Sequence, residues 1–468
     1  TLTILHQVGD VMKDFPIRFV LTDEAITPSA GLALVGYLLH RTKLDKRVNA
    51  LRLPTVRREV HISHSDVIRS MIGLLATGKT DFDHIEAYRQ DDIFSASMGI
   101  QHVPSSPTLR QRLDQLACLP MTETILWEES IRLLIQRHAT LSPCWTKGKT
   151  TWLPLDIDGS PFDNSDTKKE GVSRTYKGFD GFTPLFAYAG KEGYLVHAEL
   201  RPGKQHVQDN MPSFLVTAIR RARQLTSSRL LVRMDAGNDA EANVHVCLKE
   251  DVDFVIKRNL RRESKALWFQ IASQKGKRVD DGQSEGVQTY ELCLPQKAAI
   301  DGNTYTYVQV TQVTERTMER NGQLMLVPDY EVESYWVRLK GYEHVRMSDV
   351  LALYHDHATC EQFHSELKSD LDLERLPSGK MKTNALVLVM GAFVYNLLRL
   401  IGQDLLSDPR HPLHHKVKRR RIKTIIQTVI TMAGRLVRRS RQIWMKLTRR
   451  SGYSEPLLNV YQKWREAR

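Results

Sequence analysis

The sequence has few cysteines, no cysteine pair and no apolar run long enough to cross a membrane. Its five cysteines are scattered over 468 residues without a C-x-x-C motif. This argues against a disulfide framework or a zinc ribbon and favours a reducing, cytoplasmic compartment. The longest apolar run, Ala385 to Tyr395, is shorter than the roughly 20 residues of a membrane span, so we expect a buried core helix there. The segment that begins at Thr1 also lacks the charged region and cleavage site of a signal peptide.

Most of the chain also lacks an excess of positive charge. Residues 1–400 contain 50 basic and 50 acidic residues, whereas residues 401–468 contain 17 basic and 4 acidic ones. The whole net charge of +13 therefore lies in the last 68 residues. Such a tail is typical of proteins that bind a polyanion, either nucleic acid or an anionic membrane surface. We interpret it as an amphipathic helical region whose basic face lies on a phosphate backbone. Its basic residues include Lys416, Lys418, Arg419, Arg420, Arg421, Lys423, Arg435, Arg438, Arg439 and Arg441.

Hydrophobic residues make up 41% of the chain and charged residues 26%, as in ordinary globular proteins. Residues 1–145 have mostly helical spacing. One helix is expected to begin at Ser105 or Ser106, with Pro107 in its first turn. It would expose Arg110 and Arg112 and bury Leu109, Leu113 and Leu116, and such a helix could enter a major groove. Alternatively, it is an ordinary amphipathic helix.

The segment from 150 to 260 has a mixed pattern of strands and helices. Strands are expected at 152–162, 182–189, 194–200, 229–234 and 253–257. Helices are expected near 210–225 and 240–250, between the later strands. This order predicts a mixed sheet, in which the first three strands are antiparallel and the last two are connected by helices. Residues 260–345 are richer in β-branched and aromatic residues and predict further strands. Helices return at 347–369 and 383–402.

Two of these strands end at an acid followed by glycine and small residues. The first ends in Asp156-Ile-Asp158-Gly-Ser and the second in Met234-Asp235-Ala-Gly. A buried acid is costly unless a positive group meets it, and paired carboxylates on neighbouring strands can hold Mg²⁺. Asp156 and Asp158 point to the same face of their strand, so either could be the ligand. We favour Asp158, because the chain leaves the strand there through Gly159. Alternatively, these acids cap turns.

A third polar motif lies on the helix that runs from Tyr354 to Lys368. His357, Glu361, His364 and Lys368 share one helical face. Glu361 could complete a metal site, while His357 and Lys368 could contact a phosphate. Alternatively, the stripe is a solvated charged face. A zinc site of His355, His357 and His364 is a weaker alternative, because the spacing is not that of H-E-x-x-H.

Taken together, these motifs resemble those of the DDE transposases of bacterial insertion sequences. That family's third-acid signature is Tyr, two residues, Arg, three residues, Glu, six residues and Lys. Tyr354, His357, Glu361 and Lys368 stand at this spacing. The likeness is greatest to the insertion-sequence family numbered thirteen-eighty, a relative of the IS-four group. Its motifs D-I-D-[GS]-S and R-M-D-[AS]-G have counterparts at 156–160 and 233–237. The departure is His357, which cannot make the bidentate phosphate contact of an arginine.

The resemblance implies an α/β fold, with an RNase H-like catalytic core that carries a β-rich insertion subdomain. An all-helical N-terminal DNA-binding domain and a basic helical C-terminal region would flank this core. The expected boundaries are 1–145 for the N-terminal domain, 150–260 and 346–405 for the two parts of the core, 261–345 for the insertion, and 406–468 for the C-terminal DNA-binding or dimerisation region.

The resemblance also implies cut-and-paste DNA transposition in the bacterial cytoplasm, in association with the nucleoid. Asp158, Asp235 and Glu361 would bind two Mg²⁺ ions, or Mn²⁺ in their place. Hydrolysis at the element ends would be followed by strand transfer by the freed 3′-OH, with or without a hairpin intermediate. The expected partners are double-stranded DNA, as terminal inverted repeats and target, and a second copy of the chain in a synaptic complex. No membrane is expected.

The expected DNA contacts include an insertion tryptophan, which in relatives stacks on a flipped base. Trp268 and Trp336 are the candidates, unless both are core residues. The full set of expected contacts is Tyr354, His357, Lys368, Trp268, Trp336, Arg110, Arg112, Lys418, Arg419, Arg420, Arg421, Arg438 and Arg439. Two other functions are compatible with the sequence. One is a metal-dependent, structure-specific nuclease that cuts without joining, and the other is a catalytically silent DNA-binding regulator.

Overall fold

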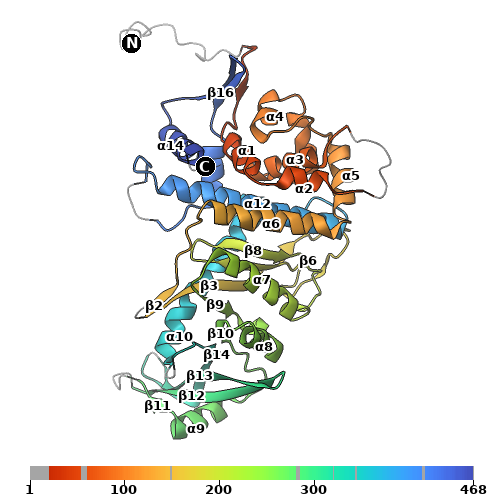
Figure 1. Cartoon of the computed structure of the whole chain (residues 1–468). Helices are drawn as coiled ribbons and strands as arrows, with labels where there is room; N and C mark the ends of the chain where they lie inside the picture. Colours follow the sequence, from red (N-terminus) through yellow and green to blue (C-terminus); the bar gives the residue numbers. More distant parts are fainter. Residues whose placement is uncertain are drawn as a thin grey trace, which may run out of the picture.

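The computed structural model describes residues 20–53, 61–147, 150–280, 285–319, 321–342, 345–413 and 417–466. Residues 1–19 and 54–60 of the expected N-terminal domain, and Lys416 of the basic tail, lie outside the described residues. The molecule is elongated (Figure 1), with helices at one end, a sheet in the middle and long strands at the other end. Sequence order and position agree only in part, because the C-terminal elements return to the helical end.

The first part of the described chain is largely helical. Its helices are α1 (Leu32–His40), α2 (Leu44–Asn49), α3 (His64–Ala76), the 3₁₀ helix η2 (Phe82–Tyr88), α4 (Asp92–Met98), α5 (Ser106–Leu116) and α6 (Pro120–Gln136), after a short strand β1 (Ile26–Thr27). The side chain of Ser105 accepts a hydrogen bond from the backbone N–H of Thr108 and so caps α5, as predicted. Arg110 is exposed, but the prediction that Arg112 is exposed is wrong. Arg112 is buried, because its guanidinium is paired with the imidazole of His64 on α3.

The central sheet has the mixed topology that the sequence predicts. Its strands are β2 (Trp145–Lys147), β3 (Thr150–Gly159), β7 (Leu185–Ala189), β8 (Tyr194–Glu199), β9 (Arg229–Met234) and β10 (Asp253–Lys257). β3, β7 and β8 pair in an antiparallel manner, whereas β9 pairs in parallel with both β3 and β10. The connections run through α7 (Met211–Leu225) and α8 (Glu241–Lys249), with a 3₁₀ turn η3 (Ala236–Asn238) after β9. A small separate sheet contains β4 (Phe162–Asp163), β5 (Ser173–Arg174) and β6 (Asp180–Phe182).

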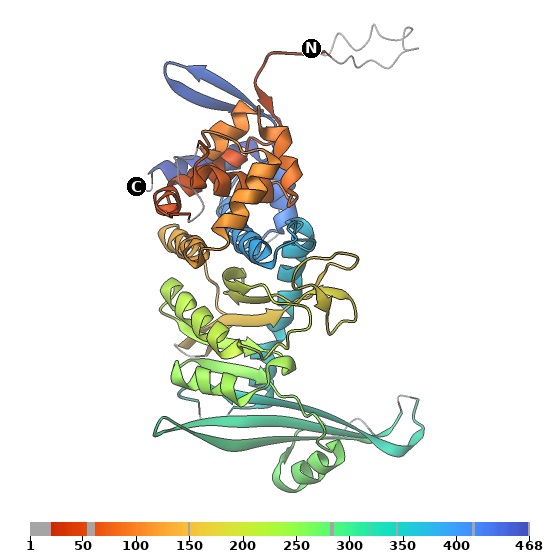
Figure 2. The same cartoon turned by 90° about the vertical axis from the view of Figure 1, so that its right-hand side faces the viewer.

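The β-rich segment after β10 extends the central sheet and does not form a sheet of its own. It contains α9 (Lys265–Lys275), β11 (Lys277–Arg278), β12 (Val287–Ile300), β13 (Asn303–Met318) and β14 (Leu324–Arg338). β14 pairs antiparallel with β10, with Ile256 opposite Trp336. The sheet therefore runs without interruption in the order β11-β12-β13-β14-β10-β9-β3-β7-β8. Figure 2 shows β12, β13 and β14 as long ribbons that extend across the molecule, with α9 packed beneath them.

The helical segment after β14 changes its winding three times. It consists of α10 (Met347–Tyr354), the 3₁₀ helix η4 (His355–Thr359), α11 (Cys360–Ser365) and a π-helical turn η5 (Glu366–Asp370). The sequence predicts one helix here, and the backbone is helical throughout. Turns of 3₁₀ or π type within a helix are frequent at functional sites and at strained sequences.

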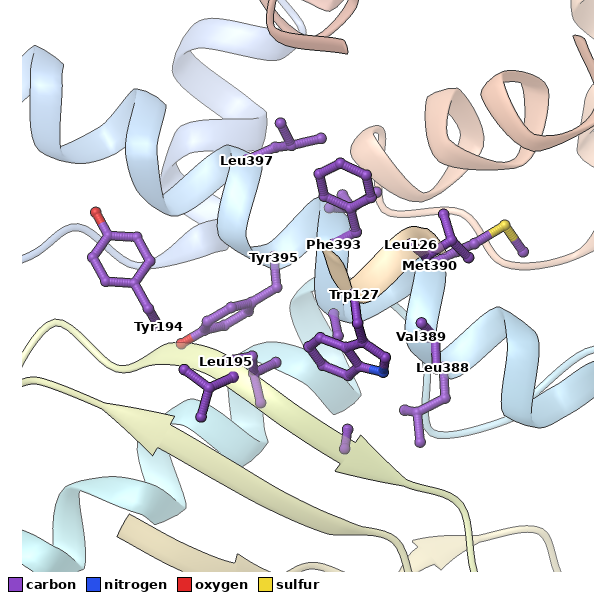
Figure 3. Close-up of a cluster of buried hydrophobic side chains, with 14 of the residues drawn as sticks. Leu126, Trp127, Tyr194, Leu195, Leu388, Val389, Met390, Phe393, Tyr395 and Leu397 are labelled. Atoms are coloured by element: carbon purple, nitrogen blue, oxygen red, sulfur yellow. The ribbon is translucent and has the colours of Figure 1, made fainter. Parts of the chain in front are cut away.

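The long helix α12 (Met381–Leu406) is the core of the molecule. It lies between the N-terminal helices and the sheet (Figure 1). In the described part of the chain it is the one helix that is long and apolar enough to cross a membrane, but 94% of its most apolar window is buried within the protein. Figure 3 shows its side chains between α6 and β8. The labelled residues are Leu388, Val389, Met390, Phe393, Tyr395 and Leu397 of α12, Leu126 and Trp127 of α6, and Tyr194 and Leu195 of β8. The predicted buried core helix is confirmed.

The basic tail is not wholly helical, and the prediction of a helical region over 406–468 is wrong in part. It contains α13 (Ile422–Ile425), a π turn η6 (Ile426–Ile430), the strands β15 (Gly434–Arg439) and β16 (Gln442–Leu447), and α14 (Ser454–Glu466). β15 and β16 form a hairpin, and β1 adds a third strand at the edge of β15. β15 is a strand because β1 and β16 supply hydrogen-bond partners along its two edges. An amphipathic helix would satisfy its backbone hydrogen bonds internally and would need neither partner.

Candidate active site

Asp156 and Arg233 form a buried ion pair between the neighbouring strands β3 and β9. They lie directly opposite each other in the parallel register. Nε and an Nη of Arg233 donate to the two carboxylate oxygens of Asp156 at 2.6 and 2.7 Å, and the other Nη donates to the backbone oxygen of Leu353 at the end of α10. Burial alone would raise the pKa of Asp156, but Arg233 and His357 outweigh it and hold that pKa below its ordinary value.

His357 belongs to this ion pair and not to the surface. Its Nδ1 lies 3.0 Å from the Oδ1 atom of Asp156, and the side chain is buried. The predicted phosphate contact through His357 would require this pair to open. Among the described residues, one group brings three metal-ligand types within 4.8 Å of one another, namely Asp156, His357 and Cys360. Because Arg233 already neutralises Asp156, the ion pair explains this group without a metal.

Asp158 and Asp235 follow this pair at the carboxyl ends of the same two strands. Asp158 lies two residues beyond Asp156 on the same face of β3, and Asp235 follows the last residue of β9. Burial, followed by the nearby charge of Asp235, raises the pKa of Asp158 to about 6, although His357 lowers it in part. The described residues thus place two carboxylates at neighbouring strand ends, and neither has a lysine or arginine ion-pair partner among these residues.

Short local contacts fix the orientation of both carboxylates. The backbone N–H of Gly159 donates to Oδ1 of Asp158 at 2.8 Å. The side-chain amide of Asn238, on the turn after β9, donates to Oδ1 of Asp235 at 2.7 Å. Each acid keeps a second oxygen that these contacts do not use, so the pair can still bind a ligand.

The helical segment of α10, η4, α11 and η5, which we call the irregular helix, contributes three side chains to the region around Asp158. Nδ1 of His364 lies 3.8 Å from Oδ2 of Asp158, and its Nε2 is buried without a hydrogen-bond partner. Burial, with Lys368 next, lowers the pKa of His364 to about 3, so its imidazole is neutral. Nζ of Lys368 donates to the backbone oxygen of Pro161 at 2.6 Å. Burial and the charges of Asp235 and Asp158 raise the pKa of Tyr354, which stays a neutral phenol.

Glu361 lies on the exposed side of this helix. Among the described residues its carboxylate has no hydrogen-bond or ion-pair partner. It lines a cleft of about 630 Å³ together with the Asp156–Arg233 pair. The other residues that line this cleft include Lys191, Asp356, Gln362, Glu366, Lys418, Arg419 and Arg421. The structure therefore brings Asp158 and Asp235 together and leaves Glu361 free on the neighbouring helix.

The two candidate tryptophans flank a single arginine on the extended part of the sheet. The guanidinium carbon of Arg258 lies 5.5 Å from the ring centroid of Trp268 on α9 and 5.1 Å from that of Trp336 on β14. Nε1 of Trp268 donates to Glu263, and Nε1 of Trp336 donates to Asp239. Both side chains are partly buried. Asp239 follows the turn after Asp235, so Trp336 is tied to the loop of the second acid.

The predicted basic contacts of the tail differ in their surroundings. Arg419 donates to Glu366 and Gln362, and Arg421 donates to Asp370 and Ser365. Both hold the tail against the irregular helix. Arg420 is buried and donates to the hydroxyl of Tyr453, so it does not face solvent. Lys418, Arg438 and Arg439 are exposed, the last two on the β15–β16 hairpin.

Sequence reasoning missed two features of the site. The first is the partnership of Asp156 and Arg233, although the motifs D-I-D and R-M-D place these residues opposite each other once their strands are parallel. The second is the loop between β5 and β6, which carries Tyr176 and Lys177. Desolvation by neighbouring groups and the charges of Asp158 and Asp235 raise the pKa of Tyr176 to about 12, although the residue is 72% exposed, and Lys177 is among the charges that lower the pKa of His364. The run Tyr176-Lys177-Gly178 gave no motif signal.

Comparisons with known proteins identify the family. Among solved structures, a cryo-EM structure of a piggyBac transposase synaptic complex with hairpin DNA matches, with 12% sequence identity and a TM-score of 0.40. The match covers 86% of this chain and 79% of that chain. A search of curated proteins finds no match. The family model described as transposase DDE domain group 1 matches residues 10–468. A match over nearly the whole length means that the chain belongs to this family of DDE transposases.

Proposed function

We propose that this enzyme carries out cut-and-paste transposition of a bacterial insertion sequence of the family numbered thirteen-eighty. The observation that carries the proposal is the pair Asp158 and Asp235, which lies at the carboxyl ends of adjacent parallel strands with the pKa of Asp158 raised to about 6. An elevated carboxylate pKa beside a second acid is typical of a site that awaits a cation or a catalytic proton. Family membership supports DNA strand cleavage and transfer as the reaction.

The donor atoms at this site fit Mg²⁺ ions, with Mn²⁺ as a substitute. Asp158 and Asp235 each offer an unused carboxylate oxygen, and Glu361 is an unpaired acid on the adjacent helix. Hard divalent cations prefer such oxygen ligands. We assign Asp158, Asp235 and Glu361 as the ligands. When bound, two ions would stabilise the attacking and leaving oxygens of phosphoryl transfer.

The protein's own residues position these ligands and the DNA. The Asp156–Arg233–His357 cluster fixes β3, β9 and the helix of Glu361 relative to one another. We assign Asp158 and not Asp156 as the first acid, because both oxygens of Asp156 are occupied by Arg233. Lys368 and Tyr354 would contact the phosphate next to the scissile bond, since Tyr354 feels the charges of both acids and Lys368 donates to the backbone of Pro161, three residues beyond Asp158. The freed 3′-OH would then attack either the opposite strand or the target.

The exposed basic residues would hold the rest of the DNA. Arg110, Lys418, Arg438 and Arg439 face solvent and can bind phosphates without breaking buried contacts. Trp268 or Trp336 would stack on an unpaired base once Arg258 is displaced, because each ring now packs against that guanidinium. Pairing of two element ends in one complex implies a homodimer on DNA, close to the nucleoid.

A cleavage and strand-transfer assay tests the proposal. The substrate is a labelled duplex with the end sequence of the element that encodes this chain, with Mg²⁺ or with EDTA. We expect metal-dependent release of 3′-OH ends and joined products. Glu361→Gln and Asp235→Asn should lower both by roughly a thousandfold, which corresponds to about 4 kcal/mol of barrier. Glu241→Gln, exposed on α8, is the matched control.

The other functions give different results in the same assay. Cleavage without joined products would support a structure-specific nuclease. Tight binding without cleavage in any metal would support a silent regulator, and activity that survives Glu361→Gln would exclude Glu361 as the third acid.

A further inference from the structure

The β15–β16 hairpin projects from the helical end of the molecule (Figure 2). Its base is packed against the body. A Cβ added at Gly434 would lie 2.6 Å from Cβ of Ala30, Leu436 is buried, and β1 pairs with the first two residues of β15. Its tip is a two-residue turn, in which Ser440 and Arg441 have φ values of 48° and 60°. This is the conformation of a type I′ turn, whose twist matches that of the flanking strands.

The two faces of the hairpin differ in exposure. Gly434, Leu436, Met445 and Leu447 share the face toward the body and are buried or half-buried. The outer face carries Trp444, which is 55% exposed, opposite the half-buried Val437. Three cations surround this pair on the same face, namely Arg435, Arg439 and Lys446, and all are exposed. The outer face is thus a small apolar centre within a basic frame.

The charge around the hairpin has one sign. Residues 434–450 contain seven basic residues and no acid. Two acids from other segments contact it: Glu24 lies 3.0 Å from Arg435, and Asp92 lies 3.4 Å from Arg438. Arg439, Arg441 and Lys446 have no ion-pair partner among the described residues. At least three positive charges therefore remain available to a polyanion.

We propose that this hairpin enters the major groove of double-stranded DNA. Arg439, Arg441 and Lys446 would contact phosphates, and Trp444 would contact base edges. Paired strands lie about 4.8 Å apart, so a two-stranded ribbon fits a groove about 12 Å wide. This inference rests on the proposed function for its partner, but it assigns a surface that lies outside the central sheet, where the two paired acids stand.

Salt-dependent binding tests the proposal. The probe is a fluorescein-labelled duplex of about three helical turns, titrated with the full-length chain between about 50 and 200 mM salt. Each phosphate contact contributes about 0.9 to the slope of log affinity against log salt. The variant R439Q/R441Q/K446Q should lower this slope by about 2–3 and weaken binding at least tenfold. The matched control, R220Q/K249Q/R316Q, removes three exposed cations of the sheet region and should keep the slope.

The role of the tryptophan and the choice of groove have their own readouts. Trp444→Ala should weaken binding about fivefold to tenfold without a change in salt slope, whereas Leu326→Ala, at a fully exposed apolar side chain of β14, should not. Methyl green, a major-groove ligand, should compete with the wild type, and distamycin, a minor-groove ligand, should not. A triple variant with the wild-type slope, or competition by distamycin alone, would overturn the proposal.

The outcomes also separate this proposal from the proposed function. Asp235→Asn should bind with the full wild-type slope although it cannot cleave. If the wild type fails to cleave but the hairpin variant still loses slope, the hairpin proposal stands and the transposase chemistry falls. If Trp444→Ala changes the sedimentation coefficient without DNA and leaves DNA affinity unchanged, the face binds a second copy and the proposal is wrong.

Discussion

Asp156 and Asp158 lie two residues apart on one face of β3, yet their surroundings are opposite. Asp156 is held by Arg233 and His357, and its pKa lies below the ordinary value. Asp158 faces Asp235, and its pKa is raised to about 6. A buried charge that is fully compensated holds elements together, whereas one that is left uncompensated costs stability in the free protein and provides a binding site. This difference separates the acid that builds the site from the acid that we assign to the chemistry.

Removal of the compensating charge should have the largest effect on this contrast. Arg233→Ala leaves Asp156 buried with only His357 beside it, and it also frees the backbone oxygen of Leu353. Loss of one partner of a buried pair typically costs about 3–5 kcal/mol. We expect this decrease in the free energy of unfolding by urea denaturation. Arg220→Ala, which breaks an exposed pair with Glu250, should change it by less than about 1 kcal/mol. If both variants lowered the free energy of unfolding equally, the buried Asp156–Arg233 pair would be no more important for stability than an exposed pair.

The raised pKa of Asp158 predicts that the free energy of unfolding depends on pH. Because the folded pKa of Asp158 is above its ordinary value of 3.8, the folded state binds the proton more tightly than the unfolded state. Its contribution is therefore favourable at low pH and is lost as pH rises from about 4 to 6. Asp158→Asn removes this dependence, so the variant should match the wild type near pH 4 and exceed it by about 2–3 kcal/mol at pH 7.

The pH prediction is checked by denaturation of both proteins across this range. The control is Asp180→Asn, at an exposed acid of β6, which should show no such divergence. A wild type that is more stable than Asp158→Asn at pH 7 would mean that Asp158 is compensated by a group that we have not identified.

A bound divalent cation should balance the negative charges of Asp158 and Asp235 and so stabilise the folded protein. At a free Mg²⁺ concentration of about 100 times Kd, binding to the folded state alone adds about 2.7 kcal/mol. The resulting rise in Tm should be present at pH 7 and weaker at pH 5, where protons compete for Asp158. Asp158→Asn and Asp235→Asn should abolish it, and Asp180→Asn should not. A Tm shift that persists in the first two variants would place the cation elsewhere.

The sequence predicted the central sheet well because its strands and helices carry separate, strong patterns. The strands near 152, 185, 195, 230 and 253 and their mixed pairing were all confirmed. The order of elements restricts the topology of such a sheet to very few arrangements. The convergence of Asp158 and Asp235 follows from the parallel register of β3 and β9, so this part of the site was predictable from strand ends alone.

Contacts between distant segments were not predictable in the same way. The tail hairpin was missed because its turn, Ser440-Arg441, lacks the Gly or Asn that usually marks positive φ. Its partner strand β1 lies about 400 residues away in sequence. Arg112 was expected in solvent from helical spacing, but the packing of α5 on α3 brings it against His64. Only the three-dimensional structure places such partners.

The pairing of β14 with β10 joins the long strands β12, β13 and β14 to the central sheet, and we call these three strands the beam. β14 has 15 residues, and at about 3.3 Å per residue it spans about 50 Å. A hinge between this beam and the acids would have to break the hydrogen bonds between β10 and β14, so the beam cannot swing as a separate body. The position of its tip relative to Asp158 and Asp235 is therefore set by the sheet, and the length of β14 equals that of about 15 base pairs of duplex DNA.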